Sequence, residues 1–306
     1  MASKTPDRQA GKHTLKDREE VAERLLEASL RHSIDPDREL DWDSPFEDGK
    51  WFWPPELISL YGTPLWQNMS EERRHRLARV EGAALASIGI WFEIVVMQLL
   101  LRHIYDKPVT SKHVRYALTE IADECRHSMM FARFLTKSGT PVYPVSPVTQ
   151  NLTRIFKSTS NTACSLVFTL LCEEVIDWMQ RVTFPDERVQ PLVRGVTRVH
   201  VIEEARHVRY AREELRRQMD AAGRLELRVT RAVTGELARV FVRSFVNPEV
   251  YPDCGVNRRA ALRQIRESEH RREVLRKGAR RLTDFLEEVG AFDRRGRRLW
   301  REAGLL

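Results

Sequence analysis

The sequence is poor in the residues that cross-link or interrupt a fold. Its 306 residues include four cysteines, none of them in a Cys-x-x-Cys pair, and 14 glycines and 14 prolines. This cysteine usage argues against a disulfide framework and favours a reduced protein with small buried thiols. The low glycine and proline content excludes collagen-like and low-complexity chains, and a hydrophobic fraction of 42% excludes disorder as the main state. A chain of this length can build a core without cross-links.

Three functional signatures are also missing. No glycine-rich dinucleotide fingerprint occurs, so we expect no nucleotide-binding unit for NAD(P)H within this chain. Residues 1–16 lack the apolar segment of a secretory signal, which favours a cytoplasmic protein. The net charge is +7 (51 basic minus 44 acidic residues), but acids are interspersed with the bases. We therefore expect a mixed, solvated surface and no nucleic-acid partner.

One apolar stretch is nearly long enough to cross a membrane. It covers residues 83–101 and carries Glu93 near its centre. A charge at that position costs about 2.5–3.5 kcal/mol in a bilayer. The stretch is better explained as a buried helix of a bundle, and we expect no membrane association. Glu93 then becomes a buried carboxylate that needs a partner.

Helical periodicity dominates the rest of the chain, and no segment alternates as a strand does. Caps and breakers predict helices over 17–32, 70–105, 111–137, 158–182, 191–219, 226–243, 258–276 and 280–289. Residues 1–15 are expected to form a frayed tail, 34–69 an irregular aromatic-rich wrap, and the prolines at 141–147 a loop. The fold class is all-α, with a ferritin-like four-helix bundle and additional peripheral helices. We divide the chain into a tail with a short helix (1–45) and one domain (46–306), whose four-helix core covers about 70–219 and whose C-terminal helices cover 222–306.

The four central helices carry one acidic pattern twice. Glu93 precedes Glu124 by 31 positions, and Glu173 precedes Glu204 by 31. The second glutamate of each pair is followed three residues later by a histidine, at His127 and at His207, so that the pattern repeats at an offset of 80. Residues i and i+3 share a helix face. Two facing hairpins would therefore gather four carboxylates and two imidazoles, which is the arrangement that defines di-iron and di-manganese bundles.

A single Glu-x-x-His is weak support, because 29 glutamates and nine histidines in 306 residues produce about one by chance. The sequence contains four. Glu72/His75 and Glu267/His270 lie among arginines without an upstream glutamate in an apolar segment, and we interpret them as coincidences. The two matched copies, each with a buried partner glutamate, predict a dinuclear metal centre.

Two positions stay open at this level. Glu174 competes with Glu173, although the repeat spacing and the inward helix face favour Glu173. His200 lies one turn before Glu204, where the first copy has Glu120. A histidine at such a position is either a third imidazole ligand or a residue that orients a ligand.

These residues resemble the AurF-like arylamine N-oxygenases, the p-aminobenzoate N-oxygenase family. The resemblance is carried by residues 121–134 (IADECRHSMMFARF), 170–181 (LLCEEVIDWMQR) and 186–215 (DERVQPLVRGVTRVHVIEEARHVRYAREEL). It implies a di-iron centre with an additional histidine ligand. Carried over residue by residue, the metal ligands would be Glu93, Glu124, His127, Glu173, His200, Glu204 and His207.

The resemblance further implies that O2 is activated at two iron ions and converts an aryl amine to the hydroxylamine and nitro product. Mixed carboxylate and imidazole ligands suit iron, with manganese as a mis-loaded metal. Electrons would come from an external ferredoxin or reductase, and a homodimer is expected. The alternatives are a di-iron hydroxylase or desaturase acting on carbon, and a ferritin-like iron-binding or oxidase protein without an organic substrate. Arginines in the stretch 294–301 are candidates for binding an acidic group of the substrate, although solvated charge is the simpler interpretation.

Overall fold

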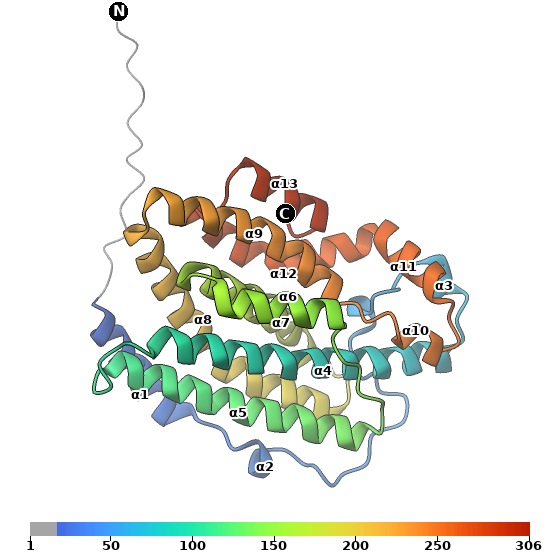
Figure 1. Cartoon of the computed structure of the whole chain (residues 1–306). Helices are drawn as coiled ribbons and strands as arrows, with labels where there is room; N and C mark the ends of the chain where they lie inside the picture. Colours follow the sequence, from blue (N-terminus) through green and yellow to red (C-terminus); the bar gives the residue numbers. More distant parts are fainter. Residues whose placement is uncertain (1–16) are drawn as a thin grey trace, which may run out of the picture.

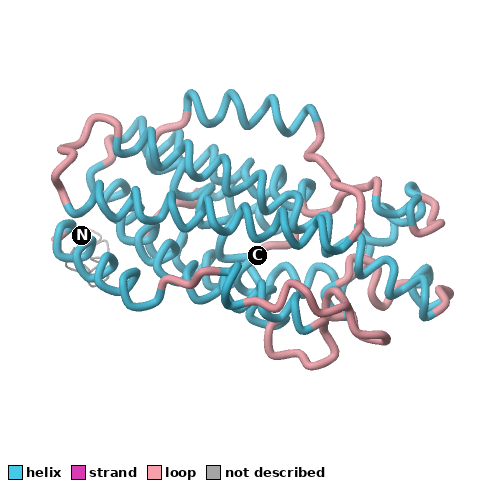
Figure 2. The backbone as a smooth tube through the Cα atoms, turned by 90° about the horizontal axis from the view of Figure 1, so that it is seen from below, coloured by secondary structure: helices cyan, strands magenta, loops and turns pink. Residues whose placement is uncertain are grey.

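The structure is a computed structural model that describes residues 17–306, so the expected tail at 1–15 lies outside the described residues. The part described is helical, with one isolated bridge between Trp51 and Val189 and no strand (Figures 1 and 2). Its elements are α1 (Arg18–His32), α2 (Pro36–Glu39), a 3-10 turn η1 (Pro55–Leu57), α3 (Pro64–Gln67), α4 (Glu71–Ile104), α5 (Lys112–Ser138), α6 (Pro147–Thr159), α7 (Thr162–Thr183), α8 (Pro191–Ala221), α9 (Arg224–Ser244), α10 (Val250–Asp253), α11 (Arg258–Glu267), α12 (Glu269–Glu288) and α13 (Arg294–Ala303).

Four long helices form the core. Helices α4 and α5 make one hairpin and α7 and α8 make the other, and the hairpins meet through α4 with α7 and α5 with α8 (Figure 1). The connection between the hairpins is long and contains α6, as the single crossover of a ferritin-like bundle requires. The expected all-α class with a four-helix core is confirmed.

Local sequence signals fix the ends of these helices. Side chains of Ser70, Ser111 and Asn161 accept hydrogen bonds from backbone amides in the first turns of α4, α5 and α7. Helix α5 ends at Gly139, whose φ of 63° is the left-handed conformation that glycine adopts without strain. The helix ends therefore set the register in which the two acidic patterns face each other.

The remaining helices cover the bundle. Helix α1 lies on α5 and α8, α9 and α12 pack on α7, and α13 packs on α9. The aromatic-rich segment between α1 and α4 is mostly irregular, as expected, with only short turns in it. Trp42, Phe52 and Trp53 of this segment are buried in the main core.

Three expected boundaries are wrong. The proline-rich loop contains the separate helix α6, because Pro147 lies in its first turn, where no amide hydrogen bond is lost, and Ser146 caps it. The expected helix 258–276 breaks at Ser268, which caps α12. The expected gap between 276 and 280 is helical. A Cβ at Gly278 would lie 3.2 Å from the ring of Trp178, so the glycine allows α12 to pack closely on α7. Helix α13 was not expected at all.

Helix α4 is apolar and long enough to cross a membrane by length and composition, with half of its most apolar window buried. Phe92, Val95 and Leu99 belong to the main core, Val96 and Leu100 pack in a smaller cluster with α1, and Ile94 and Leu101 are exposed. Packing within the protein therefore buries part of the apolar surface of α4.

The C-terminal helix provides a test of the peripheral packing. Trp300 is fully buried, and its indole Nε1 donates to the carbonyl oxygen of Thr234 at 2.8 Å. We expect Trp300→Ala to lower the free energy of unfolding by about 3–5 kcal/mol, because a large cavity opens between α9 and α13. Urea denaturation measures the change, and Arg298→Ala, on the exposed side of α13, serves as the control, with a change within about 0.5 kcal/mol. Equal effects of the two substitutions would contradict this packing.

Candidate metal centre

The four core helices bring all seven predicted ligands to one buried cluster. Overlapping groups of their donor atoms lie within 4.8 Å of one another, and every one of the seven is at most 3% exposed. Helix α4 contributes one glutamate, α5 one glutamate and one histidine, α7 one glutamate, and α8 one glutamate and two histidines. These residues are Glu93, Glu124, His127, Glu173, Glu204, His207 and His200. The matched spacing along two hairpins thus becomes a single site.

The centre of the cluster is formed by the two Glu-x-x-His pairs. His127 Nδ1 lies 3.0 Å from Glu124 Oε2, and His207 Nδ1 lies 3.0 Å from Glu204 Oε2. His207 Nδ1 is also 2.9 Å from Glu124 Oε1 on the facing helix, so the two Glu-x-x-His pairs are in direct contact. These four residues form one group of potential ligands, on the face where α5 meets α8.

His200 belongs to the cluster as well. Its Nε2 lies 3.2 Å from Glu93 Oε1, and it groups both with Glu93 and His127 and with Glu173 and Glu204. The structure therefore places His200 among the candidate ligands and leaves Glu120 outside these groups. Glu120 is buried with no hydrogen-bond partner on either oxygen. Burial, with nearby Glu124 and Glu204, raises its pKa well above the usual value, although His207 opposes the shift.

The two open glutamate positions are separated by their contacts. Glu173 joins the cluster, and its Oε1 is buried without a hydrogen-bond partner. Glu174 points away from the cluster and accepts a hydrogen bond from Arg212 Nε at 2.7 Å.

The two Glu-x-x-His pairs interpreted as coincidences lie outside the cluster. His75 stacks on Trp51, His270 contacts the backbone oxygen of Glu56, and neither joins the cluster.

Each imidazole of the cluster has its second ring nitrogen engaged by an outer residue. His127 Nε2 lies 2.9 Å from Glu203 Oε2, His207 Nε2 lies 3.2 Å from Asp123 Oδ2, and His200 Nδ1 lies 2.7 Å from Gln180 Oε1. Metal-binding histidines are oriented in this way, because a carboxylate or carbonyl oxygen that accepts from one nitrogen directs the lone pair of the other toward the ion.

The outer carboxylates cross between the repeats. Asp123 precedes Glu124 but holds the histidine of the second motif, and Glu203 precedes Glu204 but holds the histidine of the first. Arg206 lies 3.2 Å from Asp123 Oδ2 and Arg126 lies 3.5 Å from Glu203 Oε1, so each acid also meets a guanidinium.

Sequence reasoning missed these outer residues. The signal was present for the acids and the arginines, because 123 and 203, like 126 and 206, share the offset of 80. Gln180 has no counterpart in that repeat and could not be found from it.

The cluster fits cations on electrostatic grounds. In the part of the chain that the structure describes, Glu93 Oε2, Glu173 Oε1 and Glu204 Oε1 are buried without hydrogen-bond partners. Burial, together with the neighbouring carboxylates, raises the pKa of Glu93 and of Glu173 well above the usual range. Burial would also raise the pKa of Glu124, but His207 and His127 hold it well below its usual value. Unpaired buried carboxylates are costly, and metal ions remove that cost.

A second group of potential ligands lies away from this cluster. His103, His113 and Glu214 have donor atoms within 4.8 Å of one another. Arg18 Nε already donates to Glu214 Oε1 at 3.1 Å. Although burial would raise it, His103 and Arg18 hold the pKa of Glu214 at about 2. This group is therefore an ion-pair network that joins α1 to the bundle.

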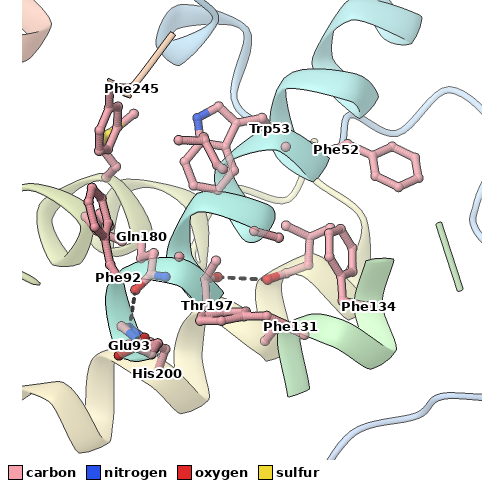
Figure 3. A pocket seen from close by; sticks show the side chains of 18 of the residues that line it. Phe52, Trp53, Phe92, Glu93, Phe131, Phe134, Gln180, Thr197, His200 and Phe245 are labelled. Atoms are coloured by element: carbon pink, nitrogen blue, oxygen red, sulfur yellow. Dashed lines mark hydrogen bonds and ion pairs between the residues drawn. The ribbon is translucent and has the colours of Figure 1, made fainter. Parts of the chain in front are cut away.

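A cavity of about 60 Å³ reaches the cluster from one side (Figure 3). Glu93, Glu173 and His200 form the part of its wall that belongs to the cluster. The rest is mainly apolar, with lining residues that include Phe52, Trp53, Leu85, Gly89, Phe92, Phe131, Phe134, Ile176, Met179, Gln180, Val193, Val196, Thr197 and Phe245. An engineered cavity of about 150 Å³ holds a benzene molecule. Wall side chains must therefore shift to admit one aromatic ring.

The arginines of residues 294–301 are not part of this wall. They belong to α13, which packs on α9, and Arg295 and Arg297 form ion pairs with Glu236 and Glu287 at the surface. The suggestion that they bind an acidic group of a substrate is not supported by this placement.

The cluster predicts how the metal-free protein responds to pH. The buried glutamates raise the pKa of His127 to about 9 and that of His207 well above its usual value, although burial itself opposes both shifts. Between pH 7 and 9 the folded state then holds protons that the unfolded chain has lost. We expect the free energy of unfolding to fall by about 2 kcal/mol per pH unit across this window, because two histidines contribute.

Chemical denaturation of chelator-treated protein measures this dependence. Protein incubated with ferrous iron is the matched sample, and its stability should fall less steeply because bound ions replace the protons. A metal-free stability that is flat or rises between pH 7 and 9 would show that these histidines are not protonated together in the folded state.

Comparison with known proteins gives three findings. Residues 15–290 match the family described as P-aminobenzoate N-oxygenase AurF. Uncharacterized proteins of Mycobacterium tuberculosis and Mycobacterium bovis are 28% identical over 215 residues, which is 68% of this chain and 63% of those relatives. An R2-like ligand-binding oxidase with an aerobically reconstituted Mn/Fe cofactor has a TM-score of 0.45 at 11% identity, covering 94% of this chain and 95% of that one. A mutant of such an oxidase with a non-activated Mn/Mn cofactor has a TM-score of 0.44 at 12% identity, covering 86% and 93%.

Proposed function

Because the chain belongs to the p-aminobenzoate N-oxygenase AurF family, we propose that it is a di-metal oxygenase that N-oxygenates an aryl amine at two iron ions. The observation that carries the proposal is the apolar cavity that ends on Glu93, Glu173 and His200. Once its wall side chains shift, it would hold an aromatic ring directly beside the candidate ligands. The family match over residues 15–290 supports the family. The proposed substrate and metal are argued from the residues of this site.

Seven residues would hold the two ions: Glu93, Glu124, His127, Glu173, His200, Glu204 and His207. Carboxylate and imidazole donors without thiolate suit iron, with manganese as the metal that could replace it. When bound, such a pair of ions supplies the activation of O2. The first oxygenation consumes one amine, one O2, two electrons and two protons, and yields one hydroxylamine and one water. Since the chain has no recognisable dinucleotide fingerprint, we assign the electrons to a separate ferredoxin or reductase.

The chain's own residues orient and shield this chemistry. Gln180 fixes the ring of His200, and Glu203 and Asp123 fix the rings of His127 and His207. The aromatic walls keep bulk water from the side of the cluster where the amine would lie. Glu93 and Glu173 both line the cavity, so the amine would approach between α4 and α7.

The metal content is the first test. We expect two irons per chain by elemental analysis of protein produced with iron. Glu173→Ala should lower that content, because it removes a cluster carboxylate. Glu174→Ala is the matched control, since this neighbour binds Arg212 outside the cluster and should leave the iron content unchanged. A single metal per chain, or equal loss in both variants, would contradict the seven-residue assignment.

The reaction is the second test. Reduced, iron-loaded protein supplied with O2 and a panel of aminoarenes should give hydroxylamine and nitro products, identified by mass spectrometry. Gly89→Leu is the informative variant. A Cβ on Gly89 already lies 3.7 Å from the ring of Phe131, so a leucine fills the cavity one turn from Glu93. We expect it to lose most turnover while keeping its iron.

The alternatives predict other products. Hydroxylated or desaturated carbon without any N-oxidised product would indicate oxygenation of carbon. Iron uptake and O2 consumption that Gly89→Leu leaves unchanged, with no organic product, would indicate a ferritin-like oxidase.

A further inference from the structure

The charged side chains of the cavity lie at one end only. Its charged or titratable lining residues are Glu93, Glu173 and His200, all of the metal cluster. Among the described residues no lysine or arginine lines it. No charged residue of the described chain lines the opposite end, and Arg271, in a separate small cavity that shares Leu85, Met179 and Phe245 with this one, lies there with Glu81.

That opposite end has one unsatisfied donor. Trp53 is 7% exposed, and its indole Nε1 is buried with no hydrogen-bond partner among residues 17–306. Figure 3 shows Trp53 and Phe245 across the cavity from Glu93 and His200. Thr197 donates to the Val193 carbonyl, and Gln180, whose Oε1 meets His200 Nδ1, belongs with its Nε2 amide to the cluster end of the cavity. The indole is therefore the free polar group of the distal wall.

A buried N–H without a partner is unfavourable, and a ligand that accepts its hydrogen bond removes that cost. One neutral donor does not compensate the desolvation of a carboxylate, which requires an opposite charge or several donors. The distal end thus favours a neutral acceptor over an anion.

We propose that the substrate is an aryl amine whose end opposite the amine is uncharged and carries a hydrogen-bond acceptor, such as an amide or ketone oxygen, for Trp53. This inference rests on the proposed function for placing the amine at the ligands. It separates this chain from oxygenation of p-aminobenzoate, whose carboxylate would lie at the distal end.

Binding to the iron-loaded, oxygen-free protein tests this without turnover. Isothermal titration with 4-aminobenzamide and with 4-aminobenzoate compares a neutral acceptor with an anion on the same ring. We expect the benzoate to bind at least about 100-fold more weakly. Equal or tighter binding of the benzoate in any orientation, or no binding of the amide, overturns the proposal. A preference for the amide without any N-oxidised product would support this inference while the proposed reaction fails.

Two variants locate the preference in the distal wall. Trp53→Phe keeps the ring and removes the donor, so it should weaken 4-aminobenzamide by about 10-fold and leave aniline unchanged. Equal weakening of both ligands would mean a structural role only and would overturn the assignment of Trp53.

Val193 is the site for adding a charge. It lines the cavity on α8, two turns and about 10 Å before His200. Val193→Lys should shift the preference toward 4-aminobenzoate, and Val193→Met is the neutral control of similar length. If the lysine variant does not fold, the wild-type ratio and Trp53→Phe still decide. A lysine that folds and leaves the ratio unchanged overturns the proposed orientation.

Discussion

The burial of carboxylates at the centre of the bundle is the constraint on which the rest of the structure depends. Five glutamates, at 93, 120, 124, 173 and 204, are at most 3% exposed, and several of their oxygens have no hydrogen-bond partner. A hydrophobic core of this size would be more stable without them. Imidazoles contact the acids at 93, 124 and 204 directly, and metal ions could bind beside them. The guanidinium groups of Arg206 and Arg126 contact the outer acids Asp123 and Glu203.

The pseudo-symmetry of the two hairpins explains the layout. The motif of two acids, a spacer, arginine and histidine occurs at 123–127 and again at 203–207. Each copy supplies one ligand pair and one outer acid, and the outer acid serves the other copy. The symmetry breaks at Glu120 and His200, which share the offset of 80 but differ in chemistry. This difference makes the two halves unequal, because His200 joins the cluster and lines the cavity, whereas Glu120 does neither.

The sequence was informative where short-range rules act. The expected starts at 70 and 111 and the expected end near 137 agree with the caps observed at Ser70, Ser111 and Gly139, because capping depends on neighbouring residues. The helical period and the hairpin length pointed to six of the cluster residues, with Glu174 competing with Glu173, and His200 was added as a ligand by the family resemblance. Helix α6 and the break at Ser268 were missed because proline and serine have two structural meanings, and packing selects between them. Gly278 falls in the expected gap between 276 and 280, but the helix continues through it and packs on Trp178, which is 100 residues away in the chain. The cavity and Trp53 depend on how the irregular segment before α4 folds back, which no periodicity describes.

The crossed hydrogen bonds also bear on the order in which the site can form. Asp123 and His207 are 84 residues apart, and His127 and Glu203 are 76 apart. A nascent chain that ends after α5 therefore has one ligand pair, but its imidazole has no outer acid to fix its orientation. Only when α8 has left the ribosome and docked are both rings held in place. Stable metal uptake must accordingly follow the docking of the two hairpins, and contacts of such long range are the slow steps of helical folding.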